Sequence, residues 1–303
     1  MSAITSTFSN FVQGVLYRGR EGHYAYIFHR VSGLAILSFL ALHIVDTSWV
    51  YFAPAAYLEA IHLYGSVPFL ISEYALFAAI IYHGVNGLNI ILKDTFPNWW
   101  TKHQQPNSFW RVIVLSLLLW LPAAFFISRT LYLEYICHCA PESPVTRDYN
   151  AATLITPFVF VFVLSVLAYG GTFSNTVTSK APRYVSRPGK NFETWGWLFM
   201  RWSGGLLVPL VWMHVLANAL LTGAHYITLD YVAARWADAF QRGSVFTILI
   251  FAFAHGMNGL HAIVNDYLHN ETANKIANGV IFVVWLVITA IGAYAVIQGV
   301  RTV

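Results

Sequence analysis

Long apolar stretches separated by short polar segments dominate this chain. Seven of them are long enough to cross roughly 30 Å of hydrocarbon as helices, at residues 29–52, 67–92, 109–130, 153–172, 197–221, 243–265 and 276–299. The fourth is the shortest and contains Pro157, which disfavours an unbroken helix. The pattern predicts an all-α polytopic membrane protein with about seven transmembrane helices.

Composition agrees with this prediction and limits the chemistry. The 303 residues are 57% hydrophobic and only 10% charged, whereas a soluble domain carries roughly 25% charged residues. Two cysteines are too few for an iron–sulfur cluster, and no glycine-rich nucleotide fingerprint follows a strand-like run. The segment Cys137-His138-Cys139 is compatible with a metal site, a disulfide or no role, and we favour the last. Redox chemistry on a soluble substrate would therefore need a partner protein.

The basic residues predict an orientation. Of the 17 lysines and arginines, 12 lie in the N-terminal segment through Arg30 and in the loops at 93–111, 173–201 and 265–275, and five lie on the opposite side. Basic residues favour the cytoplasmic side of a membrane. We therefore expect a multi-pass protein of the bacterial cytoplasmic (inner) membrane with a cytoplasmic N-terminus, and no nucleic-acid partner.

Two parts of the chain repeat each other in their polar positions. Residues 82–88 (YHGVNGL) match residues 254–260 (AHGMNGL), and residues 28–33 (FHRVSG) match 199–204 (FMRWSG). The fourth span returns the chain to the side where the first copy began. The sequence thus predicts two parallel three-helix repeats, 1–135 and 197–303, joined by a linking span and a basic linker at 136–196.

Each copy contains two histidines within its apolar spans. Parallel repeats are related by an axis along the membrane normal, so His43 should face His214, and His83 should face His255 nearer the inner surface. Intramembrane histidines are costly and usually functional, and histidine is an axial ligand of haem iron. We predict two bis-histidine haem sites stacked along the normal. Pairing within a repeat, His43 with His83, is the second choice because those depths differ.

Small residues accompany the histidines. Gly87 and Gly259 follow their histidines by four residues and share the same helix face, which would give clearance for a porphyrin. Ser32 and Ser203 precede the other histidines by eleven residues and are also placed on the ligand face. Such glycines are otherwise common at helix-packing positions in membranes, but their duplication beside histidines favours the haem interpretation.

A proton or metal transporter is the non-redox alternative, because it could also use buried histidines. It would more often pair them with several buried carboxylates. Only Asp46 and Glu73 are clear intramembrane acidic candidates here, and both could serve proton transfer near the outer haem or simply bond to neighbouring helices.

The quoted motifs resemble a known family. His29-Arg30-Val31-Ser32-Gly33, with His83 and Asp94 on the next helix, looks like the larger anchor subunit of succinate dehydrogenase. Arg201-x-Ser203, His214, His255 and Asp266-Tyr267 look like the smaller one. The chain is similar to a fusion of the two membrane anchors of a succinate:quinone oxidoreductase (complex II), or fumarate reductase, of the type with two b haems.

The resemblance implies roles for individual residues. His83 and His255 would ligate the inner haem iron, and His43 and His214 the outer one. His29, Arg30 and Arg201 would meet haem propionates or quinone at the inner surface. Tyr267, Asp266, Arg30 and Tyr26 would form the quinone site, where the family often has a serine in place of Tyr26. His261 receives only a weak role near the inner haem.

The resemblance also implies partners. A flavoprotein subunit would oxidise succinate, and an iron–sulfur subunit on the cytoplasmic face would pass electrons to a quinone, for which we expect menaquinone. The chain would carry no catalytic residue of its own and would act as the membrane subunit of the enzyme. The alternative within redox proteins is a di-haem cytochrome b serving another dehydrogenase, such as a hydrogenase or formate dehydrogenase.

Overall fold

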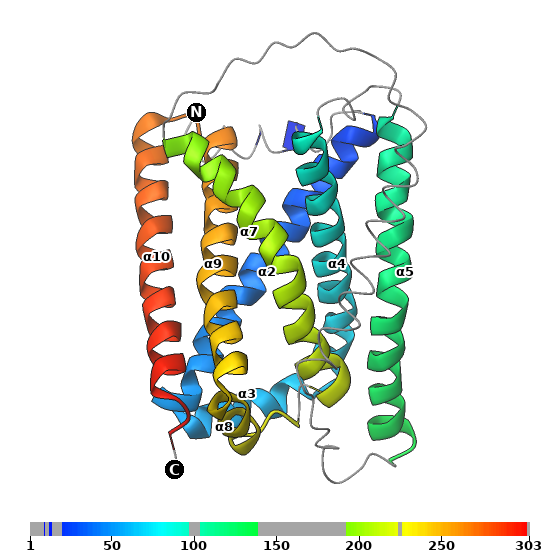
Figure 1. The fold of residues 1–303 in the computed structure, drawn as a ribbon, viewed down its shortest axis with the longest axis vertical. Coiled ribbons are helices and arrows are strands. Elements are labelled where there is room, and N and C mark those ends of the chain that lie inside the picture. Colours follow the sequence, from blue (N-terminus) through cyan, green and yellow to red (C-terminus); the bar gives the residue numbers. More distant parts are fainter. Residues whose placement is uncertain are drawn as a thin grey trace.

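In a computed structural model, residues 20–96, 104–138, 192–223 and 226–301 are described, together with residues 9, 12 and 13. The regular elements among them are all helical, which confirms the all-α prediction (Figure 1). They are α2 (Glu21–Phe52), α3 (Pro54–Tyr64), α4 (Val67–Thr95), α5 (Gln105–Leu131), η2 (Tyr132–Ile136), α7 (Phe192–Val215), η3 (Leu216–Thr222), α8 (Leu229–Ala237), α9 (Ala239–Tyr267) and α10 (Glu271–Gln298).

Six of the seven predicted spans correspond to helices that are long and apolar enough to cross a membrane. These are α2, α4, α5 with η2, α7 with η3, α9 and α10. The predicted fourth span at 153–172 lies outside the described residues. Cys137 is disulfide-bonded, so the choice of no role for this segment was wrong, and Cys139 lies outside the described residues.

Two short helices lie between predicted spans: α3 between the first and the second, and α8 between the fifth and the sixth. Pro54 occupies the first turn of α3, where its missing N–H costs no hydrogen bond. Thr228 caps α8 by accepting a hydrogen bond from the backbone N–H of Tyr231. Each short helix connects the first long helix of a predicted repeat to the second, on the same side of the bundle (Figure 1).

The helices form one bundle in which the two halves of the chain interlock. Figure 1 shows α5 and α10 at opposite edges, with α2, α4, α7 and α9 between them. Helix α2 packs on α9, and α7 packs on α4, so both contacts cross between the halves. Large apolar side chains remain exposed along α5 and α10, among them Leu117, Leu118, Leu121, Phe125, Val280, Val283 and Leu286. Such outward-facing apolar surface is what a bilayer would cover.

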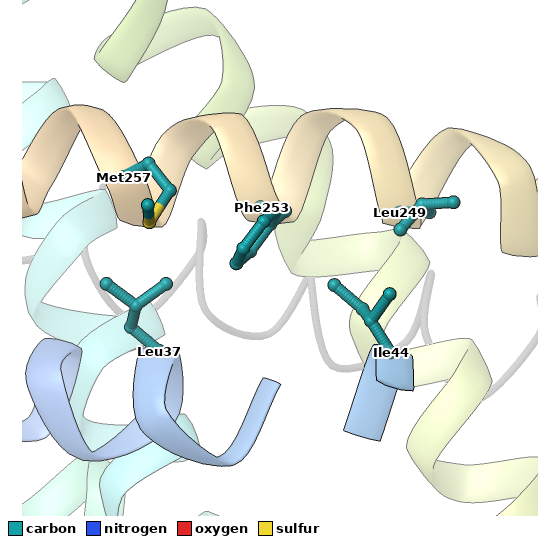
Figure 2. Packing of buried hydrophobic residues seen from close by; sticks show 5 residues of the cluster. All are labelled: Leu37, Ile44, Leu249, Phe253 and Met257. Carbon is teal, nitrogen blue, oxygen red and sulfur yellow. The ribbon is translucent and has the colours of Figure 1, made fainter. Parts of the chain in front are cut away.

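A buried cluster joins α2 to α9. Leu37 and Ile44 on α2 face Leu249, Phe253 and Met257 on α9 (Figure 2). Phe253 is fully buried, and these residues recur at helical spacing on both elements. The cluster fixes how the first half of the chain sits against the second.

Helix α10 packs closely on this cluster through Gly292. A Cβ atom built there would lie 2.7 Å from Cγ2 of Ile44 and 3.1 Å from Cδ1 of Leu249, whereas one at Gly279 on the same helix meets nothing within 4 Å. We expect Gly292→Ala to be less stable than Gly279→Ala by about 1–3 kcal/mol, the usual cost of overpacking. Thermal unfolding of both variants in detergent would measure this, and equal midpoints would contradict it.

Candidate functional site

The histidines predicted to lie nearer the inner surface, His83 and His255, meet between the two halves of the chain. "Inner" here names the end of the bundle at which α2 begins. His83 on α4 and His255 on α9 have ring centroids 6.3 Å apart, with their planes 85° from parallel. These are the two histidines that the matching motifs at 82–88 and 254–260 predict to face each other. One comes from each predicted repeat.

Hydroxyl and carbonyl groups fix the orientation of these two rings. Ser203 Oγ donates to the carbonyl oxygen of Phe199 at 2.5 Å and lies 2.8 Å from Nδ1 of His255. The Ser203 hydroxyl proton is therefore used in the bond to Phe199. The Ser203 oxygen then accepts a hydrogen bond from Nδ1–H of His255. In the other half, Nδ1 of His83 lies 3.1 Å from the carbonyl oxygen of His29 and 3.4 Å from Ser32 Oγ. Both rings then carry the proton on Nδ1 and a free lone pair on Nε2.

Two glycines make room for these rings, Gly33 beside His83 and Gly204 beside His255. No role for them was predicted from the sequence. A Cβ atom at Gly33 would lie 2.9 Å from Cε1 of His83, and one at Gly204 would lie 3.4 Å from Cε1 of His255. Gly87 and Gly259 are less confined: the nearest atoms to an added Cβ are Cε1 of His29 at 3.7 Å and Cε of Met200 at 3.8 Å. The Ser-Gly pair that recurs at 32–33 and 203–204 is the feature of the sequence from which this role of the glycines could have been predicted.

The outer histidines form a second pair across the halves. His43 on α2 and His214 on α7 have ring centroids 6.1 Å apart, at an interplanar angle of 68°. Each has a polar side chain four residues later near Nδ1: Thr47 Oγ1 at 3.5 Å from His43, and Asn218 Nδ2 at 3.3 Å from His214. The duplication therefore extends to the groups beside the ligand candidates.

One large cavity connects the two pairs. Its volume is about 1770 Å³, and its lining is mainly apolar with all four histidines on its wall. Gly33, Gly87, Gly204 and Gly259 also line it. A typical small-molecule site measures roughly 300–1,000 Å³, so this space exceeds one ordinary ligand. Among the described residues no group of three or more His, Cys, Asp or Glu side chains could hold a metal ion directly.

Two ion pairs close the inner end of the bundle, and they are equivalent under the duplication. Arg30 on α2 pairs with Asp266 at the end of α9, and Arg201 on α7 donates to Asp94 at the end of α4 at 2.8 and 2.6 Å. Each arginine thus comes from one half and its aspartate from the other. The pairing of these residues across the two halves is not apparent from the sequence alone.

Each arginine lies against at least one aromatic ring, but the aromatic residues differ between the two halves of the chain. The Arg30 guanidinium lies 4.1 Å from the ring centroid of Tyr26 and 5.7 Å from that of Tyr267. Arg201 instead lies 4.3 Å from the centroid of Trp197. The four residues expected around a quinone, Tyr26, Arg30, Asp266 and Tyr267, are therefore brought together at one inner corner of the bundle.

Two further histidines have defined contacts. His29 stacks on His83, with ring centroids 4.0 Å apart and planes 7° from parallel. His261 uses both ring nitrogens in hydrogen bonds, Nδ1 with Asn278 at 2.7 Å and Nε2 with Asn265 at 3.0 Å. His29 therefore belongs to the inner pair, whereas His261 links α9 to α10.

Comparisons with known proteins point to one family. The family model described as "Succinate dehydrogenase/Fumarate reductase transmembrane subunit" matches residues 14–123 and 179–296. A similar protein is the "Succinate dehydrogenase 2 membrane subunit SdhC" of Mycobacterium tuberculosis, which is 32% identical over 114 residues, covering 37% of this chain and 81% of that protein.

The crossed ion pairs should stabilise the bundle. Because Arg201 and Asp94 are only 27% and 19% exposed, Asp94→Asn should lower the free energy of unfolding by about 1.5–3 kcal/mol, the range for hydrogen bonds to charged groups. Thermal unfolding in detergent reports the change. Glu271→Gln, which breaks the exposed pair of Glu271 with Lys275, is the control and should cost under ~1 kcal/mol.

A double-mutant cycle isolates this pair. Arg201→Gln should add little destabilisation once Asp94 has been replaced, because both changes remove the same contact. Fully additive effects would show that the pair contributes nothing of its own.

Proposed function

Because the chain belongs to the family of succinate dehydrogenase/fumarate reductase transmembrane subunits, we propose that it holds two b haems and a quinone site and carries electrons from an iron–sulfur subunit to the quinone pool. The observation that carries the proposal is the pair of facing histidines at each of two levels. Succinate oxidation would take place on a flavoprotein partner, so this chain is the membrane subunit of the enzyme.

The histidine separations fit one iron between each pair. The nitrogen of a zinc-bound imidazole lies about 2.0–2.1 Å from the metal and about 1.1–1.2 Å from its ring centroid, so two imidazoles that held one metal ion would place their centroids roughly 6.2–6.6 Å apart. The observed separations are 6.3 Å for His83–His255 and 6.1 Å for His43–His214. Edge-to-face packing of two aromatic rings also gives centroid separations of about 4.5–7 Å, so the proposal rests on the recurrence of facing histidines at two levels and not on the spacing itself.

The groups behind the inner histidines fit axial ligation as well. A metal-ligating histidine usually donates its other ring N–H to a carbonyl or a similar acceptor, which fixes the tautomer. Ser203 and the carbonyl oxygen of His29 do this for the inner pair. The cavity between the levels is large, apolar and glycine-lined, as a flat prosthetic group requires. We therefore assign His83 and His255 to the inner haem and His43 and His214 to the outer haem.

The inner arginines and His29 are suited to contact the propionate groups of a bound haem. Arg30 and Arg201 lie at the end of the bundle nearest the inner pair, and guanidinium binds carboxylates strongly. Both are already paired with aspartates, so a propionate would share or displace Asp266 and Asp94. When bound, haem supplies one-electron transfer; the residues hold, orient and shield it.

The inner corner around Arg30 is the proposed quinone site. The Tyr26 and Tyr267 hydroxyls and the Arg30 guanidinium can donate hydrogen bonds to quinone carbonyl oxygens, and Asp266 fixes the arginine. The second copy has Trp197 and Thr95 in place of these tyrosines, which supports one inner site rather than two. We expect menaquinone as the substrate.

The proposal includes a location. The six apolar helices make the chain a multi-pass membrane protein, and the basic residues favour an N-terminus in the cytoplasm of a bacterium with the flavoprotein and iron–sulfur partners on that side. The matched segments 14–123 and 179–296 support the two repeats that we propose for 1–135 and 197–303, with 136–196 between them.

Haem analysis tests the two sites. The purified chain should contain about two b haems, as expected for two bis-histidine sites. His83→Ala and His43→Ala should each remove one, leaving one haem per chain with a changed reduced-minus-oxidised spectrum. His62→Ala, on the exposed surface of α3, is the control and should retain both. A wild-type chain with fewer than two haems would overturn the two-haem proposal.

Quinone reduction tests the inner corner. Tyr267→Phe removes a hydroxyl donor but keeps the ring over Arg30, so succinate:quinone reductase activity should fall about 10²-fold or more, as for loss of a polarising donor. Electron transfer from succinate to a soluble dye acceptor should persist. Thr95→Val, the equivalent position in the other copy, is the control. Unchanged quinone reduction in Tyr267→Phe would move the site elsewhere.

A further inference from the structure

The two halves also differ beside the outer histidines. Asp46 follows His43 by three residues, while Ala217 occupies the equivalent position after His214. The Asp46 side chain places Oδ1 3.7 Å from Nδ1 of His43. Of the four facing histidines, His43 is the one with a carboxylate contact in the described part of the chain. The histidines therefore occur in both halves of the chain, whereas the acidic side chain beside them occurs only in the first half.

Asp46 is surrounded by donors. It is buried, with 8% of its surface exposed. Tyr64 on α3 donates a hydrogen bond to Oδ2, and Thr47 donates to Oδ1 at 3.3 Å. Burial, together with this hydrogen bond, raises the pKa of the Tyr64 hydroxyl, so that Tyr64 remains a donor. An ionised carboxylate only accepts hydrogen bonds, and these contacts match that form.

A cation stands behind the other outer histidine. The Arg235 guanidinium donates to the Tyr231 hydroxyl at 3.1 Å, and Tyr231 donates to Oδ1 of Asn218 at 3.1 Å. Asn218 in turn lies beside Nδ1 of His214. Arg235 also lines the cavity. The outer pair is thus flanked by an acidic group on the α2 side and a basic group on the α7 side.

These charges act on whatever His43 and His214 hold. Inside a low-dielectric bundle a charge a few ångströms away is weakly screened, and groups behind an axial histidine tune the metal. We propose that Asp46 tunes the outer haem site through His43, stabilising the oxidised iron and lowering its reduction potential, and that Arg235 opposes it from the His214 side. This inference rests on the proposed function, and it assigns Asp46 a role distinct from the proton transfer considered for it from the sequence.

Potentiometric titration of the b-haem spectrum in the assembled complex tests it. Asp46→Asn removes the charge and keeps the shape, so the outer midpoint should rise by about 59 mV, equivalent to a tenfold change in the ratio of reduced to oxidised haem for a one-electron couple. The inner midpoint should stay within a third of that shift. Arg235→Gln should lower the outer midpoint. The His43→Ala spectrum identifies which transition belongs to the outer haem.

A matched carboxylate on another helix provides the control. Glu73 lines the same cavity from α4, and in the described part of the chain it makes no ion pair with a histidine. Glu73→Gln makes the same carboxyl-to-amide change and should move the outer midpoint less than half as far as Asp46→Asn. Equal shifts would overturn the assignment, because the effect would then be a general one of net charge.

A further variant keeps the inference testable if Asp46→Asn fails to retain the outer haem. Tyr64→Phe keeps the carboxylate and removes one of its donors, so the outer midpoint should fall, and a rise would contradict the inference. Two haems with unshifted midpoints in Asp46→Asn would defeat this inference alone. Fewer than two haems in the wild-type chain would instead defeat the proposed function.

Discussion

The crossed contact between the halves of the chain is the constraint on which the rest depends. Helix α2 packs on α9, and α7 packs on α4, and at the inner end each arginine of one half pairs with an aspartate of the other. These contacts set both the depth and the rotation of four helices. The facing histidines at two levels are a consequence, because equivalent residues on crossed, equivalent helices must meet near the axis.

The frame is duplicated, but its chemistry is only partly so. The histidines, the Ser-Gly pairs beside the inner rings and the Arg–Asp pairs recur in both halves. The tyrosines around Arg30 and the carboxylate beside His43 occur once. Under the proposed function, the two iron sites would follow the repeat. The single quinone site would depend on the residues at one corner that break it.

Hydropathy was sufficient to predict six helices, because spans in a bilayer must satisfy their own backbone hydrogen bonds. The duplication predicted which histidines face each other. Helices α3 and α8 were missed because short helices outside the apolar spans lack that signal. The role of Gly33 and the pairing of Asp94 with Arg201 depend on how helices from different parts of the chain cross. No spacing within one helix encodes such a crossing, whereas the His43–Asp46 contact is local, at i and i+3.

The cavity at the centre of the bundle brings these features together. A cavity of about 1770 Å³ forfeits packing contacts along its whole wall. Four histidines face it, and their Nε2 atoms have no hydrogen-bond partner among the described residues. Two haems bound as we propose would restore those packing contacts, and ligands that bind the folded form stabilise it by mass action. On that proposal, the stability of the bundle and its electron transfer would depend on the same four side chains.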